Sequence, residues 1–425
     1  MKLAVVGSGI AGLSSAWLLS KQHHVTLFEA ASKLGGHTNT VDVCVDGKTF
    51  PVDTGFLVCN TRTYPNLIAL FEYLKVTTVA SEMTFAVSME SPDLEWSGSN
   101  LATLFAQKRN LVRPGFWRMV QDFLRFNRET MEPLPAISLG AYLDQQGYRR
   151  EFREWYLLPM AAAIWSCPTK TMLDYPLSTF VRFCRNHGLL QIADRPQWLT
   201  VQGGGREYVK KLAAGISEIR LGTPVQRVVT NDAGIVLTTA TGDEQFDGVV
   251  LACHSDQALA IRADDASAIE REILGSVRYQ PNRAVLHTDA AILPRDPRVW
   301  SAWNYAAGPG TSGEQPVSVS YLINKLQPLP VTTPVIVTLN PHREPAREKV
   351  LTEFDYAHPV FDHAAIAAQA RLAALQGQRG VYYAGAWGGY GFHEDGLKSA
   401  LLVANALGVM APWQTTAVIE EACAA

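Results

Sequence analysis

The chain of 425 residues is long enough to bury more than one ordinary core, which predicts two domains. Its 37 basic and 40 acidic residues give a net charge of -3, which excludes an extended nucleic-acid-binding surface and leaves only local charged patches. No CxxC pair occurs, so we expect no zinc site and no redox dithiol, but free thiols in a reducing compartment at all six cysteines: Cys44, Cys59, Cys167, Cys184, Cys253 and Cys423.

The beginning of the chain has the pattern of a βαβ unit. An apolar strand is expected over residues 3–6, a helix over 11–20 and a second strand over 25–29. The turn between strand and helix reads GSGIAG, which is a dinucleotide-binding fingerprint when a strand, a helix and a second strand surround it.

Each residue of this fingerprint has a physical role. Gly7 allows a tight turn, Gly9 lets the backbone approach a pyrophosphate, and Gly12 lets the helix pack closely on the strand. The phosphates would then lie at the positive N-terminus of the helix. Glu29, at the end of the second strand, is placed to accept hydrogen bonds from a ribose. The fingerprint predicts a dinucleotide and does not separate NAD from FAD.

Two further glycine motifs follow. KLGGHTNT (33–40) places Gly35 and Gly36 just after the second strand, where backbone amides can line an extended dinucleotide. FPVDTGFLVCN (50–60) places Asp53, Gly55 and Phe56 at a junction between a strand and a turn.

Long helical patterns dominate from about residue 76 to 197. Residues 104–129 combine basic and aromatic side chains, with only Asp122 and Glu129 as acids. The combination suits an anionic membrane surface or a lipid headgroup, and it equally suits an ordinary helix with a solvated basic face. The aromatic residues of WYLLPMAAAIWSC and WSAWNY suit either an apolar tunnel or a packed core.

Short β-rich runs return after residue 198. A glycine turn at 203–205 precedes an amphipathic helix, and turn residues then divide 221–253 into short strands. A mixed segment follows over 266–375, with strands such as VIVTLN. No second GxGxxG occurs, so we expect no built-in NADPH domain, and electrons must come from or go to a substrate, oxygen or a separate carrier.

Near the end of the chain, a glycine-rich loop runs into an apolar helix in GYGFHEDGLKSALLVAN (389–405). Consecutive His393, Glu394 and Asp395 cannot converge on a metal from a helix start. The two acids suit helix caps. His393 suits a proton acceptor or donor, or a histidine bonded to the loop backbone. With Tyr390 and Glu394 it forms our set of candidate catalytic residues.

Neither a signal peptide nor a transmembrane helix is expected. The first apolar run breaks at Gly7 without a cleavage site. The longest uncharged apolar stretch, 155–169, is shorter than the ~20 residues that a bilayer requires and contains prolines. We expect a soluble cytoplasmic protein, with contact to the inner membrane face through 104–129 as an open alternative.

GSGIAG, FEA, LGGH and VDTGF together resemble the FAD-binding part of the flavin amine oxidase superfamily, which includes protoporphyrinogen oxidases and carotenoid desaturases. LFAQKRN, IWSCP, RPQWLTV, WSAWN, VTLNP and GYGFHEDGLK resemble the flavoprotein-like N-terminal region of plant cyclopropane fatty acid synthases and related bacterial flavoproteins. This likeness covers nearly the whole chain.

The resemblance implies an α/β fold with a Rossmann-like FAD-binding domain built from discontinuous segments, and a mixed α+β substrate domain. The FAD domain would comprise 1–75, 198–265 and 376–425. The substrate domain would comprise 76–197 and 266–375.

The resemblance also implies a set of FAD contacts. Val225 would touch the adenine through its backbone, Ala252 would close the strand that returns to the cofactor, and the amides of Gly396 and Leu397 would point at the flavin N1/O2 edge. The full set is Gly7, Gly9, Ile10, Ala11, Gly12, Glu29, Ala30, Gly35, Gly36, His37, Thr38, Gly55, Phe56, Val225, Ala252, Gly385, Ala386, Gly396 and Leu397.

Three positions depart from the family pattern. His37 replaces an arginine after the glycine doublet, and Ala386-Trp387 replaces an acid after the C-terminal strand, so pyrophosphate and ribitol contacts must come partly from other groups. His393 replaces a tyrosine of the aromatic cage that aligns an amine, which counts against amine oxidation.

The expected function is that of an FAD-dependent oxidoreductase with non-covalent FAD. It would desaturate an acyl chain or other hydrophobic lipid by hydride transfer to flavin N5 at an activated position. The alternatives are an amine or porphyrinogen oxidase that produces hydrogen peroxide, and a flavin-binding accessory protein to a lipid-modifying methyltransferase.

Overall fold

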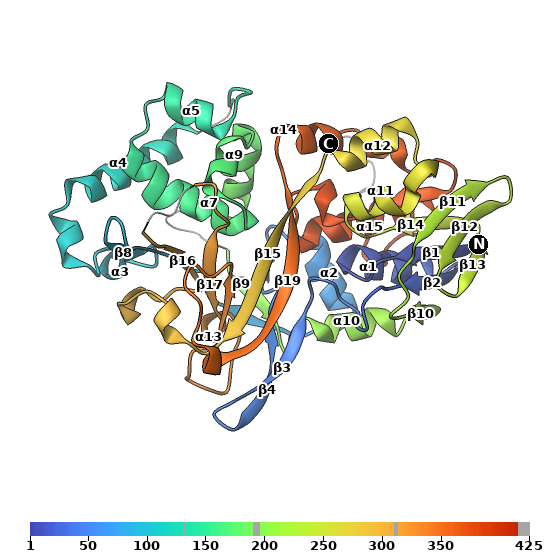
Figure 1. The fold of residues 1–425 in the computed structure, drawn as a ribbon, viewed down its shortest axis with the longest axis horizontal. Helices are drawn as coiled ribbons and strands as arrows, with labels where there is room; N and C mark the ends of the chain where they lie inside the picture. Colours follow the sequence, from blue (N-terminus) through green and yellow to red (C-terminus); the bar gives the residue numbers. More distant parts are fainter. Residues whose placement is uncertain (131–132, 190–195, 310–312, 415–425) are drawn as a thin grey trace.

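The computed structural model describes residues 1–130, 133–189, 196–309 and 313–414. Two lobes lie side by side, and the long strands β15 (Arg278–His287) and β19 (Val350–Val360) run between them (Figure 1). The lobe that contains the N-terminus is built on a parallel sheet, and the other lobe joins a mixed, mainly antiparallel sheet to a group of helices.

The parallel sheet assembles segments that are far apart in the sequence. Its order is β10 (Glu218–Arg220), β2 (His24–Phe28), β1 (Lys2–Val6), β14 (Gly248–Leu251) and β20 (Val381–Tyr383). Apolar residues dominate β1, β2, β14 and β20, as expected for strands that are buried on both faces of a sheet. Parallel pairing brings the carboxyl ends of β1, β2 and β14 to one edge, where a doubly wound sheet binds its ligand. The predicted fold class is confirmed.

The second lobe is centred on a sheet of seven strands. Its strand order is β19, β15, β18 (Ile336–Leu339), β17 (Ser318–Leu322), β16 (Trp303–Ala307), β7 (Phe85–Met89) and β8 (Leu94–Ser97). The strand expected in VIVTLN is confirmed as β18. The helices α4 (Pro114–Glu129), α5 (Leu139–Gln145), α7 (Leu158–Trp165) and α9 (Leu177–Asn186) lie at one end of this lobe (Figure 1).

All strands of these two large sheets lie within the segments predicted for the FAD and substrate domains respectively. Smaller sheets are β3 (Thr40–Val45) with β4 (Lys48–Asp53), β5 (Cys59–Asn60) with β9 (Trp198–Val201) and β6 (Thr78–Ser81), and β11 (Arg227–Asn231) with β12 (Gly234–Thr239) and β13 (Gly242–Phe246). The end of the predicted FAD domain, 415–425, lies outside the described residues.

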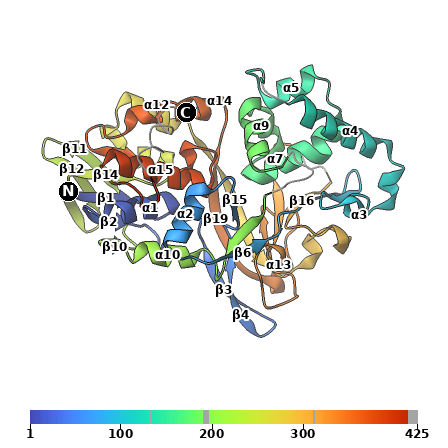
Figure 2. The same cartoon turned by 180° about the vertical axis from the view of Figure 1, so that it is seen from behind.

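Close packing between the first and last long helices joins the two ends of the described chain. α1 (Ile10–Leu19) packs on α15 (His393–Ala406), and a Cβ added at Gly396 would lie 2.7 Å from Cγ2 of Ile10. At Gly12 an added Cβ would lie 1.8 Å from the carbonyl oxygen of Gly7, so only a glycine lets the helix approach the turn this closely. Figure 2 shows α2 (Pro65–Tyr73) and α10 (Arg206–Ala213) beside this helix pair.

The remaining helices include α11 (Ser255–Arg262), α12 (Ala268–Gly275) and α14 (His363–Gln369), and α12 packs on both of the others. Cys44, Cys59, Cys167, Cys184 and Cys253 are free thiols, as predicted, and Cys423 lies outside the described residues. Among the helices of the described segments, none is both long enough and apolar enough to cross a bilayer.

Candidate functional site

One cavity of about 900 Å³ runs from the glycine turns of the parallel sheet into the second lobe. Most residues predicted to hold the dinucleotide line it: Gly7, Gly9, Ile10, Ala11, Glu29, Ala30, Gly35, Gly36, His37, Gly55, Phe56, Val225, Ala252, Gly385 and Ala386. Gly12, Thr38, Gly396 and Leu397 do not line it. The cavity therefore joins both ends of the described chain around one space, as the motifs predict.

The glycine turns leave the room that a diphosphate needs. Gly7 has φ of +100°, and an added Cβ would lie 2.9 Å from the carbonyl oxygen of Ala252. Gly36 has φ of +54°, and an added Cβ would lie 3.1 Å from Cα of Gly9. An added Cβ would press on the neighbouring strand end at Gly7 and on Gly9 at Gly36, whereas at Gly9 it would meet no atom within 4 Å, so the residues present fit an extended dinucleotide.

Glu29 ties the first turn to the second strand. Its Oε2 accepts hydrogen bonds from the Ser8 amide at 2.8 Å and the Ser8 hydroxyl at 2.5 Å, and its Oε1 accepts from the Ala31 amide at 2.8 Å. The carboxylate lines the cavity with its oxygens already oriented. Each carboxylate oxygen has two lone pairs, which leaves acceptor capacity for a ribose.

The predicted role of the Gly396 amide is wrong. α15 begins at His393, three residues before Gly396, so the Gly396 amide donates to the Phe392 carbonyl at 3.1 Å inside the helix. Leu397 is fully buried one residue further along. The amides left free of intrahelical bonds at a helix start are those of its first residues, here His393, Glu394 and Asp395.

His393 lines the cavity and is held by side chains from other segments. Its Nε2 lies 2.9 Å from the Thr38 hydroxyl and 3.2 Å from the Tyr208 hydroxyl, and its ring stacks on Phe56 with centroids 3.8 Å apart. The alternative of a histidine bonded to its own loop backbone is therefore wrong. Burial, and next the nearby His37, lower the pKa of His393 to about 3, so its imidazole is neutral near pH 7.

Glu394 points away from the cavity and into the start of another helix. Its Oε1 accepts from the backbone amide of Asn66 at 3.1 Å and from Nδ2 of Asn66 at 2.8 Å, and its Oε2 accepts from the Leu67 amide at 3.0 Å. α2 has no side-chain cap of its own at Tyr64, so Glu394 caps it from a distance of over 300 residues along the chain.

The other two residues of the predicted cluster differ in placement. Asp395 caps its own helix, as predicted, because its Oδ2 accepts from the Phe392 amide at 3.0 Å, and burial raises its pKa to about 6. Tyr390 lines the cavity, its carbonyl accepts from Nε1 of Trp165 at 3.2 Å, and burial raises the pKa of its hydroxyl.

Asp53 has a structural role that its motif did not reveal. Its buried carboxylate accepts hydrogen bonds from the Gly205 amide at 3.0 Å, the Thr40 hydroxyl at 2.5 Å and Nε2 of Gln327 at 2.9 Å. These partners belong to three separate segments. Burial raises the pKa of Asp53 to about 6.

Three histidines meet beside the glycine cradle. The ring centroid of His37 lies 6.1 Å from that of His254 and 5.3 Å from that of His358, and it stacks on Tyr356 at 5.1 Å. The sequence interpretation missed His254 and His358. His254 was foreseeable, because it follows Ala252 at the carboxyl end of a predicted strand. His358 lies within β19, where no local pattern marks it.

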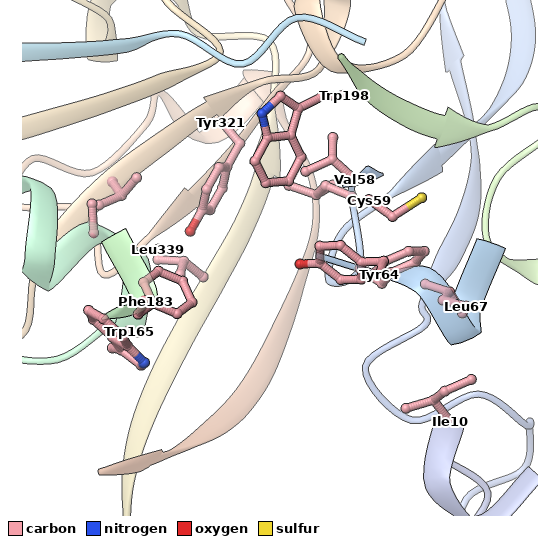
Figure 3. Packing of buried hydrophobic residues seen from close by; sticks show 14 of the residues in the cluster. Ile10, Val58, Cys59, Tyr64, Leu67, Trp165, Phe183, Trp198, Tyr321 and Leu339 are labelled. Atoms are coloured by element: carbon pink, nitrogen blue, oxygen red, sulfur yellow. The ribbon is translucent and has the colours of Figure 1, made fainter. Parts of the chain in front are cut away.

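The far part of the cavity is apolar and aromatic. Trp165, Phe183, Trp198, Tyr321 and Leu339 line it from separate elements, and Figure 3 shows how they lie around the same region. In the whole lining drawn from the described residues, Glu29 is the one Asp, Glu, Lys or Arg side chain, and it lies at the nucleotide end. The far part thus fits an uncharged, hydrophobic group.

Comparison with known proteins agrees with this geometry. The family model of flavin containing amine oxidoreductases matches residues 10–325. A carotenoid phi-ring synthase from Chlorobaculum tepidum is 28% identical over 166 residues, which are 36% of this chain and 23% of that relative's length.

Two solved structures share the fold over nearly their full lengths. A candidate protoporphyrinogen oxidase from Exiguobacterium sp. 255-15 matches with a TM-score of 0.68 and 17% identity, covering 96% of this chain and 98% of that one. A CLA-producing fatty acid isomerase from P. acnes matches with a TM-score of 0.65 and 15% identity, covering 95% and 98%.

Proposed function

Because this chain belongs to the family of flavin containing amine oxidoreductases, which are FAD-dependent, we propose that it dehydrogenates an acyl chain or another hydrophobic lipid. The glycine cradle, Glu29 and the histidines beside it would hold FAD. When bound, FAD supplies the two-electron acceptor that a dehydrogenation requires. The proposal therefore concerns the far part of the cavity, where the substrate would bind.

The observation that supports a lipid is the uncharged lining of this far half. The charged group of a protonated amine, or a carboxylate of a porphyrinogen, would lose its hydration in the far part of the cavity and find no opposite charge, which is costly. A hydrocarbon chain meets Trp198, Tyr321 and Phe183 at no such cost. One of the solved structures with this fold is a fatty acid isomerase, which adds support for an acyl substrate.

The chemistry restricts the position that reacts. Desaturation removes a hydride and a proton from neighbouring carbons, so the first C–H must be activated, for example next to a double bond or a heteroatom. We propose that His393 and Tyr390 lie against this position, because both line the cavity. A neutral imidazole is the form that accepts a proton, although a pKa of about 3 makes His393 a weak base, better suited to positioning.

Anaerobic mixing with lipids tests the proposal. The flavin absorbance should bleach with an unsaturated, a cyclopropane or a methyl-branched acyl lipid, and the product should have lost two hydrogen atoms. Absence of bleaching with all three lipid classes rejects the proposal. A His393→Ala variant with full activity would exclude only the role of His393, and Tyr390→Phe tests the second side chain in the same way.

The same measurement separates the competing functions. An isomerase gives a product of unchanged mass and no lasting bleaching. An amine or porphyrinogen oxidase bleaches with those substrates and releases hydrogen peroxide in air. An accessory protein that delivers lipid to a partner methyltransferase binds lipid without any flavin reduction during turnover.

We also propose that residues 104–129 contact an anionic membrane surface. Val112 is 82% exposed, and Leu111, Trp117 and Leu124 of the same segment are also exposed. Two aromatic residues of α4, Phe116 and Phe126, are instead fully buried, as an ordinary amphipathic helix would have them. The membrane proposal therefore depends on the exposed apolar side chains.

Ion pairs reduce the positive charge of this region. Arg109 pairs with Asp93 at 2.5 Å, and Arg125 pairs with Glu129 at 2.9 Å. The protein should sediment with phosphatidylglycerol vesicles and not with phosphatidylcholine vesicles. A Val112→Ser/Trp117→Ser variant should lose this binding, whereas Leu221→Ser, exposed on the other lobe, should retain it. Equal binding by both variants would contradict the proposal.

A further inference from the structure

The cavity contains no permanent positive charge with which to meet a diphosphate. No lysine or arginine belongs to its lining in the described part of the chain. A bound FAD brings two negative charges on its diphosphate, and the helix N-terminus of α1 offers only a partial positive charge. The lining groups that can become cationic are histidines: His37, His187, His254, His358 and His393.

His37 is the histidine next to the diphosphate cradle. It follows Gly36, whose added Cβ would lie 3.1 Å from Cα of Gly9 in the phosphate turn. Its Nε2 is buried and has no hydrogen-bond partner among the described residues. A buried ring nitrogen without a partner is costly unless a ligand supplies one, so this atom points to a ligand in the cavity.

Two more histidines extend the cluster along the cavity wall. His254 stacks on Tyr279 with centroids 4.3 Å apart, and it follows the strand end that touches Gly7. Nδ1 of His358 lies 2.9 Å from Nδ2 of Asn282, which fixes the orientation of that ring. In the described residues no group of three His, Cys, Asp or Glu side chains is placed to hold a metal ion, so the cluster is not a metal site.

We propose that His37, His254 and His358 form an anion subsite that binds the diphosphate of FAD and takes up a proton when FAD binds. His37 would thereby supply the charge of the missing arginine only when the anion is present. The inference concerns FAD binding and does not depend on which substrate the enzyme oxidises.

The surroundings of the cluster set the direction of the pH effect. Burial, and next His254, lower the pKa of His37 to about 4, and burial, and next His37, lower that of His358 to about 3. Burial also lowers the pKa of His254, which the carboxylate of Asp256 opposes. The other titratable groups that line the cavity or contact these rings are Glu29, Cys253, His393, Tyr279 and Tyr356.

A diphosphate stabilises the protonated form and raises these pKa values in the bound state only. FAD binding then takes up a proton at every pH between the low pKa of the empty site and the higher pKa of the filled site. Affinity should rise as the pH falls through the pKa of the filled site. The FAD diphosphate itself stays fully ionised in this range, so the proton must come to the protein.

Dilution of the holoprotein between pH 6 and 8.5 tests this, with flavin fluorescence reporting release and circular dichroism reporting the fold. We expect the Kd for FAD to rise about tenfold per pH unit where one proton is linked. His37→Gln should raise Kd on the order of 100-fold at pH 6.5, the scale of losing one charge pair. His37→Arg should restore tight binding and reduce the pH dependence.

Two further variants keep the test decisive if a change at His37 unfolds the protein. His254→Gln should also reduce the slope of log Kd against pH. His342→Gln should leave it unchanged, because burial also lowers the pKa of His342 and this residue lies outside the cavity. A folded protein whose Kd changes less than about twofold from pH 6 to 8.5 overturns the inference, as does an unchanged slope in both His37→Arg and His254→Gln.

Discussion

Replacing Glu394 with glutamine is expected to lower the free energy of unfolding by about 2 to 4 kcal/mol while leaving flavin chemistry intact. The reason is that its carboxylate accepts three hydrogen bonds at the start of α2, outside the cavity. If Glu394 were instead catalytic, the same change would lower turnover and leave stability unchanged. The variant therefore decides between two roles for one residue of the predicted cluster.

The magnitude follows from the geometry. α2 begins with Pro65, which has no amide hydrogen, so Asn66 and Leu67 carry the first free amides of the helix, and both donate to Glu394. A glutamine retains one acceptor oxygen and turns an NH₂ group towards the remaining donor. One buried donor then loses its partner, at about 1 to 3 kcal/mol, and the retained bonds lose the assistance of the charge.

Urea unfolding gives the free energy, and anaerobic flavin reduction by an accepted substrate gives the rate. Glu72→Gln is a matched control, because Glu72 is an exposed glutamate on the same helix, and we expect it to stay within about 0.5 kcal/mol of the wild type. A folded Glu394→Gln protein with wild-type stability and a reduction rate lowered by orders of magnitude would refute the structural assignment.

Three further variants test other parts of the structure. Between pH 4 and 7, the free energy of unfolding of Asp53→Asn, measured in urea, should rise relative to that of the wild type by up to about 3 kcal/mol. The reason is that the pKa of Asp53 is raised from 3.8 to about 6 in the folded state, which stabilises the wild type only while this carboxyl is protonated. Gly36→Ala should purify with little FAD by its visible absorbance, whereas Gly47→Ala, at a similar positive φ with no atom near its added Cβ, should retain it. Arg262→Ala should lose about 3 to 5 kcal/mol, because it leaves the buried Glu270 carboxylate without its ion pair, whereas exposed Arg271→Ala should lose little.

Sequence patterns predicted best what neighbouring residues determine. The turn at Gly7 and Gly9, the strand that ends at Glu29 and the doublet at Gly35 all lie along the cavity, because each is set by a local glycine pattern between predictable elements. The register of a parallel sheet then brings these turns to one edge without further information.

Contacts made at long range escaped prediction. The partner of Glu394 is a helix start 327 residues earlier, and Gln327 reaches Asp53 across 274 residues. The misassigned glycine shows the same limit. Gly396 looked like a donor at a helix start, but its lack of a side chain serves the close approach of Ile10, which only the packing of α1 on α15 reveals.

The departures from the family pattern become one arrangement in the structure. By the resemblance, His37 stands in place of an arginine and Ala386-Trp387 in place of an acid. Nε1 of Trp387 donates to the carbonyl of Cys253 at 3.2 Å, and Cys253 directly precedes His254. If the resemblance holds at these positions, one positive and one negative residue are replaced along the lining of the same cavity. Burial keeps His37 uncharged while the cavity is empty, so the wall avoids the cost of a buried, unpaired cation. Histidines that become protonated only when the FAD diphosphate is bound would let an otherwise apolar cavity bind this anion.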